Sequence, residues 1–276
     1  MKIDAHQHFW KYSRAAYDWI SDDMTALQKD FLPEDLQPLL AANGFEGSIA
    51  VQACQTIEET EWLLALAEWS EFIQGVVGWV DLCSPELPSQ LDSLARHRSL
   101  VGVRHVVQAE PDDEFLLRGD FQRGIARLAD YNLAYDLLIY PRHLPVAVKL
   151  AQQFPQQRFV LDHIAKPGIA DRLMDPWAPA IRELAQCQNV CCKLSGMVTE
   201  ARRKQWASAD FRPYLDVVFE AFGPQRLMIG SDWPVCTLSA SYAGTIAIVN
   251  DYIRQFPEEQ QAQIQGRNCA SFYGLK

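Results

Sequence analysis

The chain begins with the stretch KIDAHQH at residues 2–8, a short strand pattern that ends in two histidines, His6 and His8. Side chains two residues apart on an extended strand point to the same face, so this strand aims both imidazoles at one spot. The segments between the predicted strands carry apolar residues at helical spacing. Seven further short runs, rich in β-branched or aromatic residues, lie at 48–52, 75–82, 101–105, 135–140, 159–164, 190–196 and 227–234.

Each of the eight predicted strands is followed by a predicted helix. This alternation indicates parallel strands joined by right-handed crossovers. The length allows about 34 residues for each strand–helix unit, which suits a closed barrel. We therefore predict an α/β fold, a (β/α)8 TIM barrel that forms a single domain over residues 1–276. An open doubly wound sheet is the alternative, but no Gly-rich phosphate loop follows the first strand. The long aromatic and polar segment 9–30 is expected to fold over the barrel mouth as a lid.

Composition restricts the possible partners. The chain has 25 Lys and Arg residues against 35 Asp and Glu residues, a net charge of −10. Nucleic acids and anionic membranes require concentrated positive charge, so neither is expected as a partner. The seven cysteines are odd in number and scattered, which is typical of reduced thiols. No secretory signal is visible, and no apolar run reaches the ~20 residues of a membrane span. We expect a cytoplasmic monomer or homo-oligomer whose partner is a small molecule.

Polar residues recur at the predicted carboxyl ends of strands that are otherwise apolar. In a parallel barrel these ends, with the loops after them, form the active site. Each residue alone has an ordinary structural explanation, such as a hydrogen-bonded core histidine or a helix cap. Burying polar groups without partners is costly, so their recurrence on six strands indicates one shared site. The residues concerned are His6, His8, Gln52, Arg104, His105, Asp162, His163, Lys193, Asp232 and Trp233.

Several of these strand ends lie in motifs that resemble a known family. The HxH pair of strand one, LDHIAKP around His163 and GSDWP around Asp232 are similar to motifs of the amidohydrolase superfamily. Further motifs resemble those of its lactonase branch, which includes 2-pyrone-4,6-dicarboxylate lactonases and L-fucono-lactonases. These motifs are DAHQHFW, YDWI at 17–20, VRH, VCCKLSGMVTE and LMIGSDWPV. The resemblance covers essentially the whole chain. It implies hydrolysis of a sugar-acid lactone such as L-fucono-lactone, within carbohydrate metabolism and L-fucose degradation.

The same resemblance bears on metal content. Superfamily members with two metals resemble one another in a bridging lysine or carboxylate on strand four and a histidine on strand five. Here strand four offers Arg104, and His143 comes only after strand five, so a binuclear centre is not expected. A single Zn²⁺ held by His6, His8 and Asp232 is chemically reasonable, because nitrogen and oxygen ligands suit it. The lactonase branch is nonetheless similar to metal-free enzymes, which implies that no metal or other cofactor is obligatory.

Lactone hydrolysis requires an activated water, a stabilised oxyanion and a proton for the leaving alkoxide. We expect Asp232 to act as the general base for the water. An aspartate near its reference pKa of ~3.9 is a weak base, so positioning and electrostatic stabilisation should contribute more. His6, His8 and His163 are expected to donate hydrogen bonds to the carbonyl oxygen as charge builds there. Asp162, on the opposite face of its strand from His163, is expected to orient its neighbours.

Five residues are predicted to contact the substrate. Arg104 could offer its planar fork to substrate oxygens or form an ion pair with a carboxylate such as Asp81. Lys193 could likewise contact substrate or form a salt bridge with Asp162 or Asp232. The predicted substrate contacts are Arg104, Trp19, Gln52, Lys193 and Trp233.

The residues also bear on the substrate class. Aromatic faces stack on the C–H faces of sugars. A dicarboxylate such as the pyrone would require several converging arginines. Only Arg104 lies at a strand end, while Arg142, Arg202 and Arg203 lie in loops, so a neutral polyhydroxy lactone fits better. His105 alternates with Arg104 and is expected to be structural.

Three other functions are compatible with these residues. A Zn²⁺-dependent decarboxylase of the same superfamily would use the three histidines and Asp232 around one metal. A lactonase of the 2-pyrone-4,6-dicarboxylate type would share the fold and the base. A sugar-acid binding protein without turnover is the non-enzymatic alternative, but a binding protein has no need of a base among imidazoles.

Overall fold

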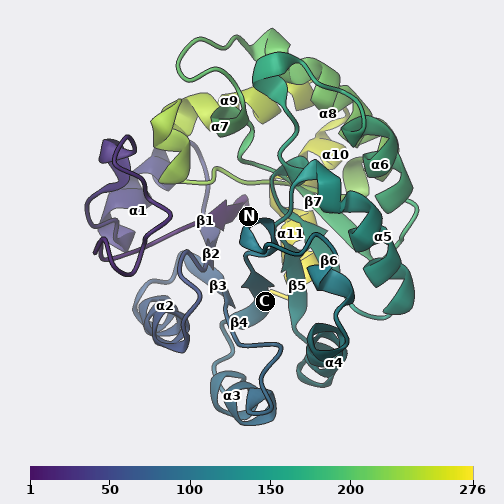
Figure 1. Cartoon of the computed structure of the whole chain (residues 1–276). Coiled ribbons are helices and arrows are strands. Elements are labelled where there is room, and N and C mark those ends of the chain that lie inside the picture. Colours follow the sequence, from purple (N-terminus) through teal and green to yellow (C-terminus); the bar gives the residue numbers. More distant parts are fainter. Residues whose placement is uncertain (276) are drawn as a thin grey trace.

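The structure, a computed structural model, describes residues 1–275 as a ring of eight strands surrounded by helices (Figure 1). Every strand is parallel to the next and the strands follow one another in chain order, so the predicted (β/α)8 TIM barrel is confirmed. The strands are β1 (Ile3–Gln7), β2 (Gly47–Val51), β3 (Ile73–Gly78), β4 (Leu100–His105), β5 (Ala134–Leu137), β6 (Phe159–Leu161), β7 (Val190–Leu194) and β8 (Leu227–Ile229).

Helices follow the strands and pack around the outside of the ring, except for the last segments, which lie across one end of it. The helices are α1 (Pro33–Ala42), α2 (Ile57–Trp69), α3 (Leu87–Leu94), α4 (Gly119–Leu128), α5 (Leu144–Gln153), α6 (Trp177–Leu184), α7 (Met197–Glu200), α8 (Ser208–Phe222), α9 (Tyr242–Ile253), α10 (Glu258–Ala262) and α11 (Asn268–Tyr273). Among the described residues, no helix combines the length and the apolar character needed to cross a bilayer.

Several strands are shorter than the sequence patterns predict. β5 ends at Leu137, β6 at Leu161 and β8 at Ile229, three to five residues before the predicted ends at 140, 164 and 234. The residues beyond these points leave the ladder and turn over the mouth of the barrel. Apolar runs predicted the strands correctly, but they also included the loops that carry the polar groups.

The ring is closed between its first and last strands by the segment after β8. The amide of Asp232 donates to the carbonyl of His6 at 2.8 Å, and the amide of His8 donates to the carbonyl of Trp233 at 2.7 Å. Below these bonds the buried Asp4 carboxylate accepts from the amide of Ser231 at 2.8 Å. Closure of the barrel therefore brings the residues after β8 beside the end of β1.

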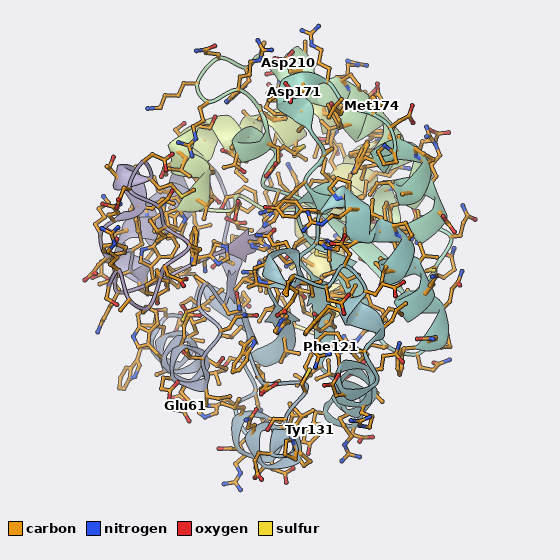
Figure 2. The ribbon with its side chains drawn as sticks, viewed as in Figure 1. Glu61, Phe121, Tyr131, Asp171, Met174 and Asp210 are labelled. Carbon is orange, nitrogen blue, oxygen red and sulfur yellow. The ribbon has the colours of Figure 1, made fainter. Side chains whose placement is uncertain are left out.

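Two apolar layers hold the barrel together. The larger lies between strands and helices, where Phe121 of α4 is fully buried, whereas Glu61 on α2 is exposed (Figure 2). The smaller fills the interior of the ring, where Ile49 and Val77 belong to one cluster with Tyr273. Tyr273 comes from α11, which lies at the centre of the ring in Figure 1 and covers the amino-terminal end of the strands. The opposite end is left for the site.

The segment between β1 and α1 is the longest connection at the barrel mouth. Trp10 and Phe31 exchange backbone hydrogen bonds of 3.0 and 2.9 Å, which close residues 11–30 into a loop. Inside the loop Tyr17 and Ile20 are buried, so it packs on its own side chains. It lies at one side of the barrel (Figure 1, purple) and forms part of the cavity wall described below.

Candidate active site

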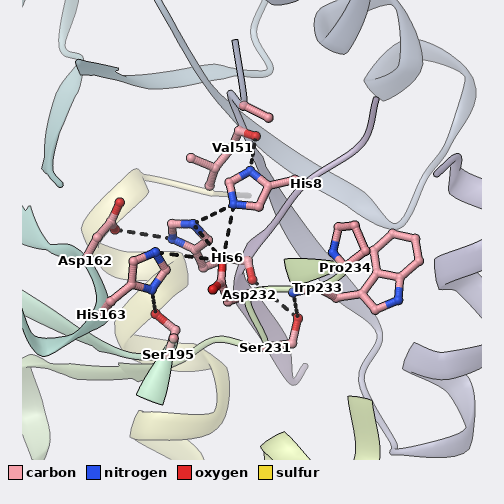
Figure 3. Close-up of polar contacts among 12 residues, drawn as sticks. His6, His8, Val51, Asp162, His163, Ser195, Ser231, Asp232, Trp233 and Pro234 are labelled. Atoms are coloured by element: carbon pink, nitrogen blue, oxygen red, sulfur yellow. Dashed lines mark hydrogen bonds and ion pairs between the residues drawn. The ribbon is translucent and has the colours of Figure 1, made fainter. Parts of the chain in front are cut away.

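Three imidazoles and one carboxylate meet at the carboxyl end of the barrel (Figure 3). The Asp232 Oδ1 atom lies 3.3 Å from His8 Nε2, 3.8 Å from His163 Nε2 and 3.9 Å from His6 Nε2. The Nε2 atoms of His6 and His8 are 3.2 Å apart. All four side chains are buried, and Asp232 has a left-handed backbone with φ 56°. Residues predicted from three strands thus converge, each presenting the same kind of atom to one carboxylate oxygen.

The turn after β6 changes the predicted orientation of Asp162. The prediction that Asp162 and His163 face opposite ways is wrong, because Asp162 Oδ1 lies 3.3 Å from His6 Nδ1 and the His163 ring lies 4.4 Å from the His6 ring. The strand ends at Leu161 and His163 has φ 54°, so strand alternation no longer applies. Gly196 makes room for this turn, since a Cβ atom there would lie 2.5 Å from His163 Nδ1.

The outer nitrogens of two histidines are held by fixed partners. His8 Nδ1 lies 2.8 Å from the carbonyl oxygen of Val51, which can only accept, so this nitrogen carries a proton. His163 Nδ1 lies 2.9 Å from the Ser195 hydroxyl. These bonds fix the ring orientations and direct both Nε2 atoms toward Asp232.

His6 has both a hydrogen-bond donor and an acceptor next to its Nδ1 atom. Its Nδ1 atom faces the Lys193 ammonium at 3.3 Å and the Asp162 carboxylate at 3.3 Å. The first can only donate and the second can only accept, so each favours a different tautomer. Its Nε2 atom lies 3.3 Å from Arg104 Nη1. Because Arg104 can only donate, this contact uses the lone pair of His6 Nε2 and favours the tautomer with the proton on Nδ1.

Burial and neighbouring charges set the protonation of the site. Burial lowers the pKa of His6 and of His163 well below the ordinary value, so both imidazoles are neutral near pH 7. Burial acts to raise the pKa of Asp232, but the neighbouring His163 and His8 rings outweigh it and hold this pKa below its usual value. At neutral pH the Asp232 carboxylate therefore faces the uncharged rings of His6 and His163.

A second group of charges, the ion-pair layer, lies beneath the histidines. Lys193 Nζ lies 2.5 Å from Asp136 and 3.1 Å from Asp162. Arg104 Nη1 lies 3.0 Å from Asp162, and the Tyr273 hydroxyl donates to Asp136 at 2.8 Å. Burial raises the pKa of Asp136 to about 6. For Asp162, burial is outweighed by the charge of Lys193 and the hydrogen bond with His6, which hold its pKa well below the usual value.

Sequence reasoning placed Lys193 and missed two of its companions. Of the alternatives for Lys193, the structure shows the salt bridge with Asp162, and the fully buried ammonium does not line the cavity. Asp136 was not singled out, although an acidic residue inside the apolar run YDLLIY was a usable signal. Tyr273 carried no signal, since an aromatic residue in a helix is ordinary.

Arg104 also has partners other than the predicted one. It pairs with Asp162 and not with Asp81, and its Nη2 atom donates to Gln52 Oε1 at 2.8 Å and to the Gln52 carbonyl oxygen. Arg104 and Gln52 both line the cavity. His105 points away from it, as expected, and its Nε2 atom lies 2.7 Å from Glu110.

Three of the four converging side chains, those of His8, His163 and Asp232, line a cavity of about 440 Å³, and the fully buried His6 lies behind them. Its walls come from the β1–α1 segment, from the loops after β2, β4, β5 and β6, and from the segment after β8. The lining residues used below are His8, Asp18, Trp19, Gln52, Ala53, Cys54, Arg104, Gln108, His163, Lys166 and Asp232.

The two tryptophans predicted to contact substrate have different positions. Trp19 lines the cavity and is 39% exposed. Trp233 is buried and its ring packs against Phe9 and Phe31, with centroids 6.2 and 5.2 Å away. The substrate contact predicted for Trp233 therefore has no counterpart in the cavity wall, because its side chain points into the core beneath the β1–α1 segment.

The site has donor atoms that suit a divalent metal ion. The ligand atoms of His6, His8 and Asp232 lie within 4.8 Å of one another. Neutral imidazoles whose other nitrogen is hydrogen-bonded are typical ligands, so the donor set fits one ion such as Zn²⁺. His143 belongs to neither of the ligand clusters among the described residues and bonds to Asp113 instead. Arg104 adds a positive charge beside His6, which opposes a second ion.

Comparisons with known proteins agree with this geometry. Residues 3–275 match the family model described as amidohydrolase. The L-fucono-1,5-lactonase of Burkholderia multivorans is 41% identical, with 100% of this chain and 96% of the relative covered. The L-fucono-1,5-lactonase of Burkholderia ambifaria is 38% identical, with coverage of 99% and 96%. A crystal structure of an amidohydrolase from Burkholderia multivorans with bound zinc has a TM-score of 0.96 at 41% identity, with both chains fully covered.

Proposed function

Because the chain belongs to the amidohydrolase family, we propose that it hydrolyses L-fucono-1,5-lactone or a closely related sugar-acid lactone to the free acid. The observation that carries the proposal is the Asp232 carboxylate facing three imidazoles at the edge of a cavity of about 440 Å³. Full-length similarity to two L-fucono-1,5-lactonases supports the class of reaction, a carboxylic ester hydrolysis.

Asp232 is the proposed general base. It lines the cavity and its lowered pKa keeps it ionised at neutral pH. It accepts a proton from water as the oxygen attacks the lactone carbonyl carbon, and it returns the proton to the ring oxygen when the C–O bond breaks. A carboxylate with a lowered pKa is a weak base, so most of the rate must come from positioning and charge stabilisation.

The histidines and Arg104 are the proposed stabilisers of the oxyanion. Donation from Ser195 to His163 Nδ1 leaves the His163 Nε2 proton free for the carbonyl oxygen. His6 does the same in the tautomer in which Lys193 donates to its Nδ1 atom, once Arg104 Nη1 turns from His6 Nε2 to the substrate. His8 commits its Nδ1 proton to a backbone carbonyl, so it donates from Nε2 only when protonated.

A zinc ion would be held by His6, His8 and Asp232. When bound, Zn²⁺ polarises a carbonyl oxygen and lowers the pKa of a water ligand. We propose that turnover does not require it, because the Nε2 proton of His163 and the guanidinium of Arg104 are available to a carbonyl oxygen bound in the cavity beside Asp232. A strained lactone is also a better electrophile than an amide.

The cavity wall favours a neutral polyhydroxy substrate over a dicarboxylate. Arg104 and Lys166 are the basic residues of the wall, and Arg142 and Arg203 instead pair with Asp113 and Asp23. The Gln52 Nε2 and Gln108 Oε1 atoms are buried without hydrogen-bond partners. Because Arg104 only donates, it fixes the Gln52 oxygen toward itself and leaves the Gln52 amide N–H groups for an acceptor such as a sugar hydroxyl.

The test is a panel of aldonolactones followed by acid release, with and without chelator. The panel contains L-fucono-, L-galactono-, L-rhamnono- and D-arabinono-lactones and 2-pyrone-4,6-dicarboxylate. We expect hydrolysis of L-fucono-lactone or L-galactono-lactone at the highest kcat/KM. Hydrolysis of the pyrone alone would overturn the substrate class. Release of CO2 from an aromatic acid by a zinc-loaded protein that leaves every lactone intact would overturn the reaction.

A further inference from the structure

Glu59 is a buried acidic residue in the first turn of α2, outside the cavity wall. We propose that Glu59 is a positioning residue that holds two segments of that wall together, residues 15–19 after β1 and residues 53–55 after β2. Through them it sets the place of Trp19 and therefore the affinity for substrate. The affinity claim depends on the proposed function, whereas the structural claim can be tested without it.

Both oxygens of the Glu59 carboxylate are used. Oε2 accepts from the backbone amides of Ala53 at 2.9 Å and Cys54 at 2.7 Å. Oε1 accepts from the Tyr17 hydroxyl at 3.0 Å. One side chain therefore joins the turn after β2 to the β1–α1 segment. Tyr17 and Glu59 are 5% and 6% exposed, so little water can replace these bonds.

The chain of contacts continues from Glu59 to the cavity. Ala53 receives the carboxylate at its amide and accepts at its carbonyl from Trp19 Nε1 at 2.9 Å. The Trp19 ring also packs edge to face against Trp10, with ring centroids 5.8 Å apart. Trp10 in turn packs on Tyr17, with ring centroids 5.9 Å apart. Trp19 is thus held from two sides, and both supports lead back to Glu59.

The hydrogen bonds of Glu59 predict how different substitutions at this position should behave. Alanine would leave three donors without an acceptor and free both segments. Glutamine has one oxygen that can accept from both backbone amides and an NH2 group that can donate to the Tyr17 oxygen, so it should rescue the arrangement. Glu58 is the matched control, because it precedes Glu59 on the same helix and is exposed.

The experiment compares Glu59→Ala, Glu59→Gln and Glu58→Ala with the wild-type chain at pH 8. For Glu59→Ala we expect KM for L-fucono-lactone to rise at least tenfold while kcat changes less than threefold. We expect Glu59→Gln and Glu58→Ala to stay within threefold of wild type in both. A KM of Glu59→Ala equal to that of Glu58→Ala, or a fall in kcat above tenfold at unchanged KM, would overturn the proposal.

A second measurement, limited proteolysis, follows the release of the β1–α1 segment directly and needs no substrate. Arg14 lies in the β1–α1 segment with a side chain that is 77% exposed. Release of the segment should speed tryptic cleavage after Arg14 at least tenfold in Glu59→Ala, and no more than twofold in Glu58→Ala. Equal cleavage in both variants would contradict the positioning role. If the wild type hydrolyses no lactone, the proposed function fails while this measurement still decides the role of Glu59.

A milder variant covers the case in which Glu59→Ala does not fold. Tyr17→Phe removes one hydroxyl and keeps the ring packed on Trp10. We expect it to raise KM about threefold and to speed cleavage after Arg14 by a similar factor. Wild-type values for both quantities would overturn the link between the two segments.

Discussion

Two layers of charged side chains lie one above the other at the carboxyl end of this barrel, and they differ in how completely their charges are paired. In the ion-pair layer, Lys193 lies 2.5 Å from Asp136 and 3.1 Å from Asp162. In the layer above, Asp232 faces the rings of His8 and His163 at 3.3 and 3.8 Å beside a cavity.

The difference indicates two tasks for buried charge. Full pairing stabilises one charge state and a fixed geometry, as in the ion-pair layer. A carboxylate that borders a cavity, as Asp232 does, can exchange a proton with a bound molecule. His6 belongs to the upper layer and contacts Asp162 and Lys193 of the ion-pair layer, so the ion-pair layer orients the His6 ring.

The largest expected effect comes from removing the base of the upper layer. Asp232→Asn keeps the shape but cannot accept the proton, so kcat for L-fucono-lactone should fall about 10³-fold. Substrate affinity and the free energy of unfolding should change little. Asp130→Asn, at an exposed position, is the control. A kcat within tenfold of wild type would show that Asp232 is not the base.

Breaking the lower layer should affect stability first. Lys193→Met leaves the buried Asp136 without its cation and Asp162 with Arg104 alone, and it should lower the free energy of unfolding by about 3–5 kcal/mol in urea titrations. Lys149→Met, at an exposed position, should change it by less than about 0.5 kcal/mol. A small loss in Lys193→Met would mean that the layer is less tightly paired than the distances indicate.

The pH dependence of stability also distinguishes the two layers. The pKa of Asp136 is raised from 3.8 to about 6, so the unfolded chain ionises this group first. Its contribution is therefore fully present below pH 3.8 and is lost as the pH rises through about 6. Relative to wild type, Asp136→Asn should gain up to about 3 kcal/mol between these limits. A difference that stays constant with pH would argue that Asp136 is ionised throughout.

Chelation should have the smallest effect. If the N–H donors of the upper layer suffice, dialysis against a strong chelator should change kcat less than twofold. Metal content measured on the same sample is the control. Complete loss of activity that zinc restores would assign the oxyanion to the metal and would leave the histidines as its ligands.

Much of this architecture could be predicted because it follows from periodic patterns. Alternating apolar runs predicted eight strands, and the rule that parallel strands end at one rim brought His6, His163 and Asp232 together. These residues lie far from one another in the chain, yet the order and direction of the strands were enough to predict that they come together.

The remaining features depend on backbone turns and on contacts between layers. Asp162 shares a side with His163 because the chain turns left-handed just after β6, which no periodicity describes. Trp233 was placed at the cavity by its neighbour Asp232, but its ring enters the core. Glu59 lies on a helix rather than at a strand end, so the rule that found the other residues did not apply to it.

The seam between β1 and the segment after β8 has a consequence for dynamics. The amides of Asp232 and His8 make the two bonds that close the ring, and the side chains of the same two residues face each other in the site. Hydrogen–deuterium exchange at these amides should therefore report local opening of the barrel and loss of the reactive arrangement as a single event. Local opening at this seam would therefore abolish activity under conditions in which most of the chain is still folded.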